Sequence, residues 1–293
     1  MARAGLSAQP RRVGVAVKTS NPEAATLGAE LLRELARRGV EGVVDAESAT
    51  ALGVAGGPPR WSLGREVDLV FVLGGDGTFL SVARGCPRAT PVAGINLGTL
   101  GFLTEHAPER TFALLDDILE GRVEVEERDR LRVTGTSAGN EPGALILNDV
   151  VITKATMARI VTIFVEVDGE FLSRYRADGL ILATPTGSTA YNLSAGGPIV
   201  HPGLSAMLIT PICSHTLTNR PLVVPSRSDV RAWVEKGHDG VWVTLDGQVG
   251  FPLEPGASVT VSPSPESLSV IRERGTSFFG ILHHKLKWGE REI

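Results

Sequence analysis

The chain has 293 residues, of which 42% are hydrophobic and 21% charged, and its formal net charge is −4. This length supports one large core or two ordinary ones, and the charge excludes a strongly basic nucleic-acid-binding protein. The two cysteines, Cys86 and Cys213, are too few for a disulfide framework, and we expect both to be buried. Because no apolar run reaches the length of a signal peptide or a membrane span, we expect a cytoplasmic protein without a membrane partner.

The first 122 residues alternate between strand-like and helix-like patterns. Short apolar runs predict buried strands at 13–17, 42–44, 68–73 and 91–95. Asn21-Pro22-Glu23 is typical of a helix start, a second helix is expected from about Thr78, and a third over 109–120. The stretch Ser48 to Pro59 is rich in small residues, glycine and proline, and predicts a mobile loop. This alternation indicates an α/β domain with a parallel sheet.

The remainder of the chain is dominated by strand-like runs. These lie at 144–153, 161–167, 170–176, 179–183, 221–224, 241–245 and 257–262. Asp168-Gly169 predicts a hairpin turn between two of them. We therefore expect an α/β domain over 1–122 and a β-rich domain over 123–272, with the apolar tail 273–293 packing back on the first domain.

The first motif, Gly74-Gly75-Asp76-Gly77-Thr78, directly follows the 68–73 run. Glycines let the backbone approach a ligand closely, and the N-terminus of the next helix favours phosphate. Thr78 is placed to cap that helix or to bind a phosphate oxygen. Asp76 repels phosphate, so its presence indicates a base for a hydroxyl nucleophile or a ligand of Mg²⁺. The alternative is a plain turn in which Asp76 caps the helix.

The second motif runs from Asp178 to Ser194 and continues into Gly196-Gly197-Pro198. A strand at 179–183 leads into a segment dense in hydroxyl side chains, which can satisfy a polar ligand without charge. Tyr191 can stack on a base and still place its hydroxyl group. The alternative is a polar Ser/Thr loop without a ligand.

Three smaller features carry polar groups within strand-like runs. Asn148-Asp149 interrupts the apolar stretch Leu145 to Ile152, and its two side chains would point to opposite faces of a strand. Asp246-Gly247-Gln248 closes another run and alone indicates a turn. Arg174 and Arg176 share one strand face. Arginine suits pyrophosphate, and an exposed salt-bridged face is the alternative.

Taken together, these motifs resemble the NAD kinase family. The resemblance includes Gly74 to Thr78, Asn96-Leu97-Gly98-Thr99-Leu100-Gly101-Phe102-Leu103, Asn148-Asp149, the Asp178–Ser194 run and Asp246-Gly247-Gln248. The first element is shared with diacylglycerol-type lipid kinases, whereas the Asp178–Ser194 run is much more specific. The resemblance implies an N-terminal α/β domain and a β-rich C-terminal domain, with NAD bound between them.

The resemblance also implies a reaction and its residues. ATP, or in some relatives polyphosphate, would donate a phosphoryl group to the 2′-hydroxyl of the adenosine ribose of NAD, with a divalent cation such as Mg²⁺. Asp76 would be the general base. The protein would assemble as a homodimer or homotetramer. The residues that match NAD or phosphate contacts are Gly77, Asn148, Asp149, Arg159, Arg176, Asp178, Thr189, Ala190, Tyr191, Asn192, Leu193, Ser194 and Gln248; the metal ligands are unknown.

One position departs from the family. Many members have Asn-Glu where this chain has Asn148-Asp149, so the carboxylate is kept but is one methylene shorter.

Two other functions stay open at this point. A lipid kinase would need a membrane-facing surface, and a non-catalytic NAD sensor would have no need of Asp76 beside a phosphate site.

Overall fold

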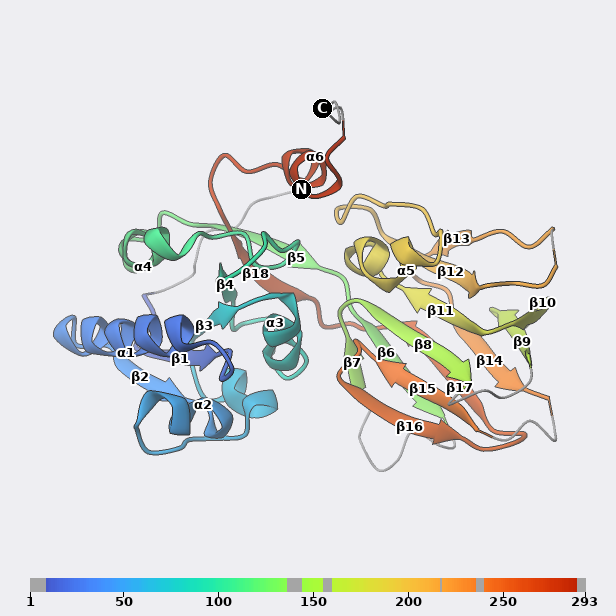
Figure 1. The fold of residues 1–293 in the computed structure, drawn as a ribbon, viewed down its shortest axis with the longest axis horizontal. Coiled ribbons are helices and arrows are strands. Elements are labelled where there is room, and N and C mark those ends of the chain that lie inside the picture. The colour runs from blue at the N-terminus through green and yellow to red at the C-terminus, as the bar shows by residue number, and fades with distance from the viewer. Residues whose placement is uncertain (1–8, 136–143, 155–159, 217, 236–239, 289–293) are drawn as a thin grey trace. The chain divides into compact units, whose positions relative to one another are not determined.

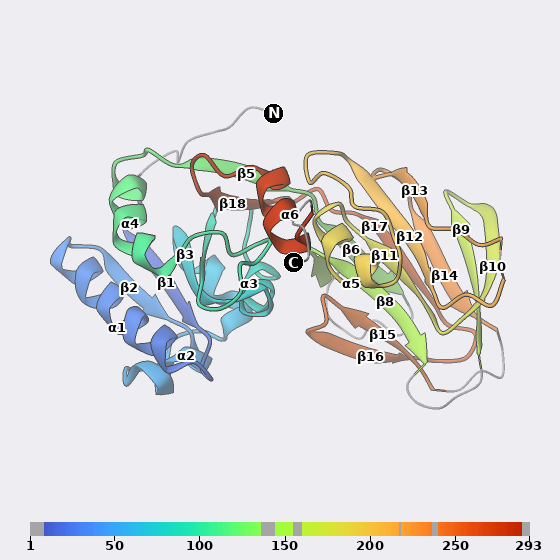
Figure 2. The ribbon, with the colours of Figure 1, turned by 45° about the horizontal axis from the view of Figure 1, so that its top comes forward.

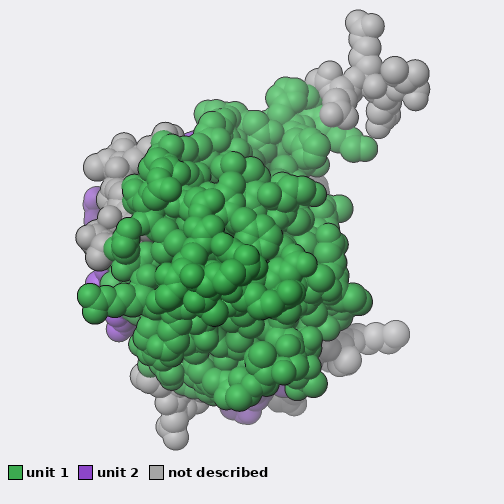
Figure 3. Space-filling view, turned by 90° about the vertical axis from the view of Figure 1, so that its left-hand side faces the viewer, with its two compact units in different colours: residues 1–127, 268–293 green, residues 128–267 purple. Residues whose placement is uncertain are grey.

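The computed structural model describes residues 9–135, 144–154, 160–216, 218–235 and 240–288. Two compact units make up the chain, as Figure 3 shows by colour. Unit 1 joins Met1–Glu127 to Leu268–Ile293, and unit 2 is Arg128–Ser267. Within the described ranges no helix has the length and apolar character to cross a membrane.

Unit 1 is built on a six-stranded sheet in the order β2-β1-β3-β4-β18-β5. Its strands are β1 (Arg12–Val17), β2 (Glu41–Val44), β3 (Leu69–Gly74), β4 (Val92–Asn96), β5 (Glu124–Arg128) and β18 (Leu268–Arg272). The pairs from β2 through β18 are parallel. The predicted α/β domain with a parallel sheet is therefore confirmed.

Helices cover both faces of this sheet (Figures 1 and 2). The elements around the sheet are α1 (Pro22–Arg37), α2 (Ala46–Leu52), η1 (Arg60–Arg65), α3 (Asp76–Ala83), η2 (Pro108–Arg110) and α4 (Thr111–Leu119). Unit 1 also contains α6 (Phe278–Leu286). Apolar side chains of α1 and α4 form one core with alternate residues of β1, β3 and β4. On the opposite face, Phe79 of α3 lies against Gly94, and Leu63 of η1 against Gly14. Burial on both faces explains why these strands are continuously apolar.

The start of α1 follows the sequence pattern. Asn21 is the N-cap, its side-chain oxygen accepts a hydrogen bond from the Glu23 N–H at 2.9 Å, and Pro22 occupies the first turn. The cap satisfies one of the N–H groups that a helix end leaves unpaired. This prediction is confirmed.

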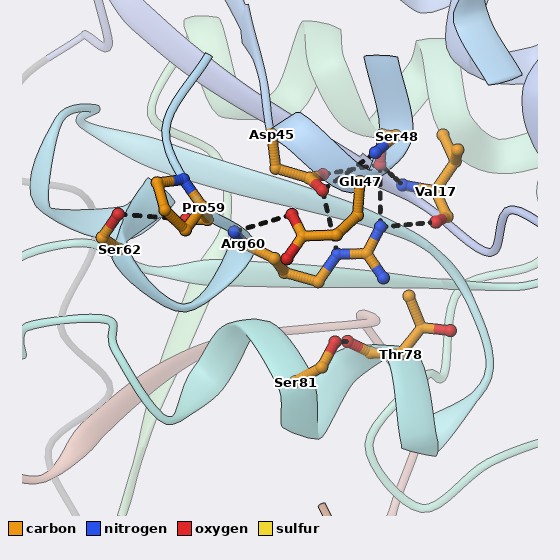
Figure 4. Close-up of polar contacts among 9 residues, drawn as sticks. All are labelled: Val17, Asp45, Glu47, Ser48, Pro59, Arg60, Ser62, Thr78 and Ser81. Carbon is orange, nitrogen blue, oxygen red and sulfur yellow. Dashed lines mark hydrogen bonds and ion pairs between the residues drawn. The ribbon is translucent and has the colours of Figure 1, made fainter. Parts of the chain in front are cut away.

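The prediction of a mobile loop over Ser48 to Pro59 is wrong in its first part, because α2 extends to Leu52. Asp45 caps this helix, and its carboxylate binds the Ser48 N–H and hydroxyl and the Arg60 Nε (Figure 4). The Ser48 hydroxyl also accepts from the Val17 N–H at 2.8 Å, and Arg60 Nη2 donates to the Val17 carbonyl at 2.9 Å. Close packing of small residues therefore extends helix α2 to Leu52, and irregular structure begins only at Gly53.

Unit 2 consists of two antiparallel six-stranded sheets. The first has the order β10 (Glu170–Ala177), β9 (Val161–Val167), β14 (Val230–Val234), β17 (Ser258–Pro263), β6 (Leu131–Gly135) and β7 (Ala144–Ile146). The second has the order β13 (Leu222–Pro225), β12 (Ala206–Ile212), β11 (Gly179–Ala183), β8 (Asp149–Lys154), β15 (Val241–Leu245) and β16 (Val249–Leu253). This confirms the β-rich character of the C-terminal domain.

The two sheets pack face to face around one apolar core. The outer face of the second sheet is covered by the segment that contains η3 (Thr186–Thr189) and α5 (Tyr191–Ser194), through Val200 and Ala195. The predicted hairpin at Asp168-Gly169 is confirmed, with both residues at positive φ. Of the two cysteines that we expected to be buried, Cys86 is buried, but Cys213 is exposed because it lies just beyond the end of β12.

The predicted strand over 144–153 is wrong as a single element. It is divided into β7 and β8, which lie in different sheets, and Leu147-Asn148 forms the crossing between them. Asn148 and Asp149 therefore do not alternate across one continuous strand. The polar pair marks the place where the chain leaves one sheet and enters the other.

Candidate active site

The carboxyl edge of the unit 1 sheet has a topological switch point between β1 and β3, because the chain adds β2 on one side of β1 and β3 on the other. Open α/β sheets bind ligands at such points. The Gly74–Thr78 motif follows β3 here, and Lys18 follows β1. A Cβ on Gly74 would lie 3.0 Å from the Lys18 Cβ and 2.8 Å from the Thr78 hydroxyl. The absence of a side chain at Gly74 thus lets the residue after β1 lie close to the first turn of α3.

The first turn of α3 is suited to an anion. Gly75 is the N-cap and offers no side-chain hydrogen bond, so the N–H groups of the first turn are left for a ligand. Gly77 is exposed, with open space where a side chain would be. The predicted start at Thr78 is two residues late, and Thr78 is not the cap, because the helix begins at Asp76.

The Asp76 carboxylate is held by the backbone of a neighbouring loop. Oδ1 accepts from the Leu103 N–H at 3.2 Å, the Thr104 N–H at 3.1 Å and the Thr104 hydroxyl at 3.0 Å. Among the residues that the structure describes, the Phe102 N–H alone donates to Oδ2, at 2.9 Å. Four hydrogen bonds fix the carboxylate, and Oδ2 keeps lone-pair capacity for one further donor, such as a substrate hydroxyl.

Gly101 is essential to this arrangement. A Cβ on Gly101 would lie 1.9 Å from Asp76 Oδ1 and 2.3 Å from the Thr104 hydroxyl. We predict that Gly101→Ala displaces the Asp76 carboxylate and lowers kcat by roughly 100-fold, since misplacement of a catalytic group by about 1 Å costs that much. Steady-state kinetics would measure this, with Gly56→Ala as an exposed control outside the site, where a Cβ makes only ordinary contacts. A Gly101→Ala protein with normal kcat would contradict the importance of this packing.

In unit 2 the hydroxyl-rich segment is held largely by its own side chains. The Thr184 hydroxyl donates to the Leu147 carbonyl at 2.5 Å, and the Ser188 hydroxyl donates to Pro185 O at 2.6 Å and accepts from the Val200 N–H at 3.0 Å. These bonds wrap the segment over the end of β11. Gly187 is required here, because a Cβ would lie 2.1 Å from the Asn148 carbonyl oxygen.

The predicted ligands Thr189 to Ser194 divide into two groups. Asn192 is fully buried: its amide donates to Ser188 O and Pro198 O, and its oxygen accepts from the Thr210 hydroxyl at 2.6 Å. Its side chain therefore supports the segment. Tyr191 is 45% exposed, and Ser194 is also exposed, while Thr189, Ala190 and Leu193 are partly exposed. This second group is available to a ligand.

Asp246 organises the crossing between β7 and β8. Its buried carboxylate accepts from the Leu147 N–H at 2.9 Å, the Asn148 N–H at 2.7 Å and the Asp149 N–H at 3.0 Å. Asn148 and Asp149 are thereby fixed beside the Gly187 turn. From the sequence, Asp246 was predicted only to lie in a turn.

Asp149 is a buried carboxyl group, 4% exposed. Burial and, to a smaller extent, the nearby Asp246 charge together raise its pKa to about 7, against a hydrogen bond from the Tyr191 N–H that lowers it. The group therefore titrates in the neutral range. It can donate a hydrogen bond when protonated and only accept when ionised.

This shift predicts a pH dependence of stability. The pKa of Asp149 is about 7 in the folded protein and 3.8 at its ordinary value. Between these two pH values the folded state keeps a proton on Asp149 that the unfolded state has lost. The free energy of unfolding therefore falls as the pH rises through this range. We predict that Asp149→Asn removes up to about 4 kcal/mol of the stability difference between pH 4 and pH 8. Urea unfolding of both proteins at the two pH values measures it. An unchanged difference would contradict the shift.

The other predicted residues lie around β8, β10 and the turn after β15. Arg176 is exposed on β10, as is Arg174, so the two share the predicted face. Asp178 is ion-paired with Lys154 at 2.7 Å. Gln248 is exposed in the turn that follows Asp246. Arg159 lies outside the described residues.

Sequence reasoning missed the groups that hold the site together. The N–H groups of residues 102–104 bind Asp76, and Asn96 Nδ2 secures the same loop through the carbonyls of Thr99 at 2.8 Å and Thr104 at 3.4 Å. These residues appeared only as part of the family resemblance. The repeated Gly98 and Gly101 after a polar strand end were the available indication of a tightly packed loop.

Comparison with known proteins agrees with these features. The ATP-NAD kinase N-terminal domain matches residues 60–123, and the ATP-NAD kinase C-terminal domain matches 147–273. An NAD kinase of Geotalea daltonii is 42% identical over 96% of this chain and 100% of its own length. An NAD kinase of Syntrophobacter fumaroxidans is 45% identical over 96% and 99%.

Solved structures have the same fold. A yeast NADH kinase complexed with NADH has a TM-score of 0.88 at 26% identity and covers 97% of this chain and 90% of its own. An NAD kinase from Archaeoglobus fulgidus in complex with ATP has a TM-score of 0.75 at 27% identity, covering 93% and 99%. The similarity thus spans both units at the level of sequence and of fold. The chain belongs to the ATP-NAD kinase family.

Proposed function

We propose that the chain transfers the γ-phosphoryl group of ATP to the 2′-hydroxyl of the adenosine ribose of NAD, giving NADP. The relatives named NAD kinase match over nearly the full length of the chain. The observation that carries the proposal is the Asp76 carboxylate, which four hydrogen bonds fix beside the phosphate-suited first turn of α3.

The reaction needs a base and a place for phosphate charge. A ribose hydroxyl is a weak nucleophile at neutral pH, and a positioned carboxylate that accepts its proton accelerates attack. Asp76 Oδ2 is the atom assigned to this proton. The N–H groups at the start of α3 are assigned to phosphoryl oxygens, where charge grows during transfer.

Unit 2 is assigned the recognition of NAD. Tyr191 supplies an exposed ring beside the polar crossing of Asn148 and Asp149. Arg176 is an exposed cation suited to the pyrophosphate. We expect Gln248, Asp178 and the exposed part of 189–194 to complete the contacts.

The residues present fit a divalent cation that arrives with the donor. No cluster of three or more potential ligands occurs among the described His, Cys, Asp and Glu side chains. Mg²⁺ commonly uses waters and substrate phosphates and only one or two carboxylates, so a cation that arrives with the donor would be held by its phosphates at the first turn of α3, while Oδ2 of Asp76 stays with the ribose hydroxyl. When bound, the cation would neutralise charge on the phosphoryl oxygens.

The test is an assay of purified protein with Mg²⁺, either ATP or polyphosphate, and either NAD or NADH. A dehydrogenase specific for NADP(H) reads the product. We expect NADP(H) with at least one donor, and light scattering should show a homodimer or homotetramer. A folded protein that binds NAD in calorimetry but forms no NADP(H) with either donor would instead be a non-catalytic sensor.

A further inference from the structure

The loop that holds Asp76, residues 97–105, ends at His106. The backbone of His106 pairs with β4: its N–H donates to the Gly94 carbonyl at 3.2 Å, and its carbonyl accepts from the Asn96 N–H at 2.8 Å. The Thr104 N–H, which binds Asp76, is only two residues away. The position of His106 therefore determines where the 97–105 loop returns to the sheet.

Both ring nitrogens of His106 face oxygen atoms. The side chain is 1% exposed, Nδ1 lies 2.6 Å from Glu273 Oε2, and Nε2 lies 3.1 Å from the Ile271 carbonyl oxygen. A carbonyl oxygen can only accept, so Nε2 must carry a hydrogen. Nδ1 then either donates to an ionised Glu273 or accepts from a protonated one.

The surroundings of Glu273 favour the first arrangement. The hydrogen bond with His106 holds the pKa of Glu273 below its ordinary value, and Arg110 lowers it further against the effect of burial. Arg110 Nη2 lies 3.5 Å from Glu273 Oε1. With Glu273 ionised, the contact at Nδ1 is a hydrogen bond only if that nitrogen carries a hydrogen, as Nε2 does for the Ile271 carbonyl.

Other charged groups around His106 largely compensate one another. Asp117 of α4 pairs with Arg110 at 3.6 Å and with Arg122 at 2.9 Å. Arg272 of β18 pairs with Glu105 at 2.9 Å and also with Glu126. Arg274 lines a small cavity together with His106 and Glu273. The carboxylate that contacts the ring itself is Glu273.

We propose that His106 is a positioning residue, held as an imidazolium ion whose two N–H groups fasten the 97–105 loop and so fix Asp76 for phosphoryl transfer. The catalytic part of this inference rests on the proposed role of Asp76. If the ring lost the proton on Nδ1, the lone pair of that nitrogen would face the lone pairs of the Glu273 carboxylate, and this hydrogen bond would be lost. The loop would then lose an anchor to the C-terminal segment of unit 1.

The protonation state is tested directly by ¹⁵N NMR of the histidine rings at pH 7.5. A His106→Gln spectrum identifies the His106 signals by their absence. We expect both nitrogens of His106 to resonate as protonated in the wild-type protein. A neutral ring would overturn the proposal, and this readout is independent of any kinase activity.

The positioning role is tested by kinetics. We expect His106→Gln to lower kcat roughly 10- to 100-fold with little change in KM for NAD, whereas the exposed control His283→Gln leaves both unchanged. Glu273→Gln removes the carboxylate that contacts Nδ1 of His106, so its kcat should also fall. The exposed control Glu109→Gln should keep the wild-type kcat.

The two arms separate the possible failures. A well-folded His106→Gln protein with kcat within twofold of wild type would overturn the positioning role. If that variant does not fold, a Glu273→Gln protein with wild-type kcat would overturn it instead. Absence of NADP(H) formation by the wild-type protein would end the proposed function, while the NMR result would still decide the state of the ring.

Discussion

Replacing Asp76 by Asn should lower kcat by roughly two orders of magnitude or more while NAD still binds, because the amide cannot accept a proton from the ribose hydroxyl. The structure adds a second consequence. The amide oxygen can keep the three hydrogen bonds of Oδ1, but the amide nitrogen would face the Phe102 N–H, so one of the four contacts is lost. The loss of one such hydrogen bond costs about 1 kcal/mol.

The measurement must therefore separate chemistry from folding. Steady-state kinetics gives kcat and KM, calorimetry gives the affinity for NAD, and thermal unfolding gives stability. Ser81→Ala is a suitable control, because Ser81 lies on the same helix and its hydroxyl donates to the Thr78 carbonyl at 2.7 Å. Near wild-type turnover by a folded Asp76→Asn protein would remove Asp76 from the role of base.

The sheet of unit 1 was predictable because its strands are buried on both faces. The runs 13–17 and 68–73 are continuously apolar and match β1 and β3 within a residue. The Asn21 cap and the Asp168-Gly169 turn were also predictable, since each depends on a residue type with one favoured local conformation. Local chemistry was enough in these places.

The sequence did not reveal which polar groups meet at long range. Asp76 is bound by residues 102–104, and Asp246 is bound by residues 147–149, nearly one hundred positions away. No periodicity encodes such a pairing. The division of 144–153 between two sheets was missed for the same reason, because the crossing is stabilised by Asp246 and not by its own residues.

Asp246 carries the second prediction with a large effect. Its carboxylate is the acceptor for three backbone N–H groups at the crossing between β7 and β8, and its own N–H donates to the Asp149 carbonyl at 2.9 Å. Asp246→Ala would leave those three buried donors without their partner. Each such group costs about 1–3 kcal/mol, so we predict that unit 2 loses about 3 kcal/mol of unfolding free energy or more.

The side chain also acts on its neighbour, which gives a second readout. Asp246 has φ 50°, a conformation that Asn tolerates better than Ala, so Asp246→Asn is the matched comparison. Its single carbonyl oxygen can still accept from the Asn148 and Asp149 N–H groups, and we expect an intermediate loss in urea unfolding. Both variants remove a negative charge from beside Asp149 and should lower the pKa of that carboxyl group from about 7. Equal stability of the wild-type and Asp246→Ala proteins would mean that water or a relaxed backbone replaces the carboxylate, and the crossing would then need another explanation.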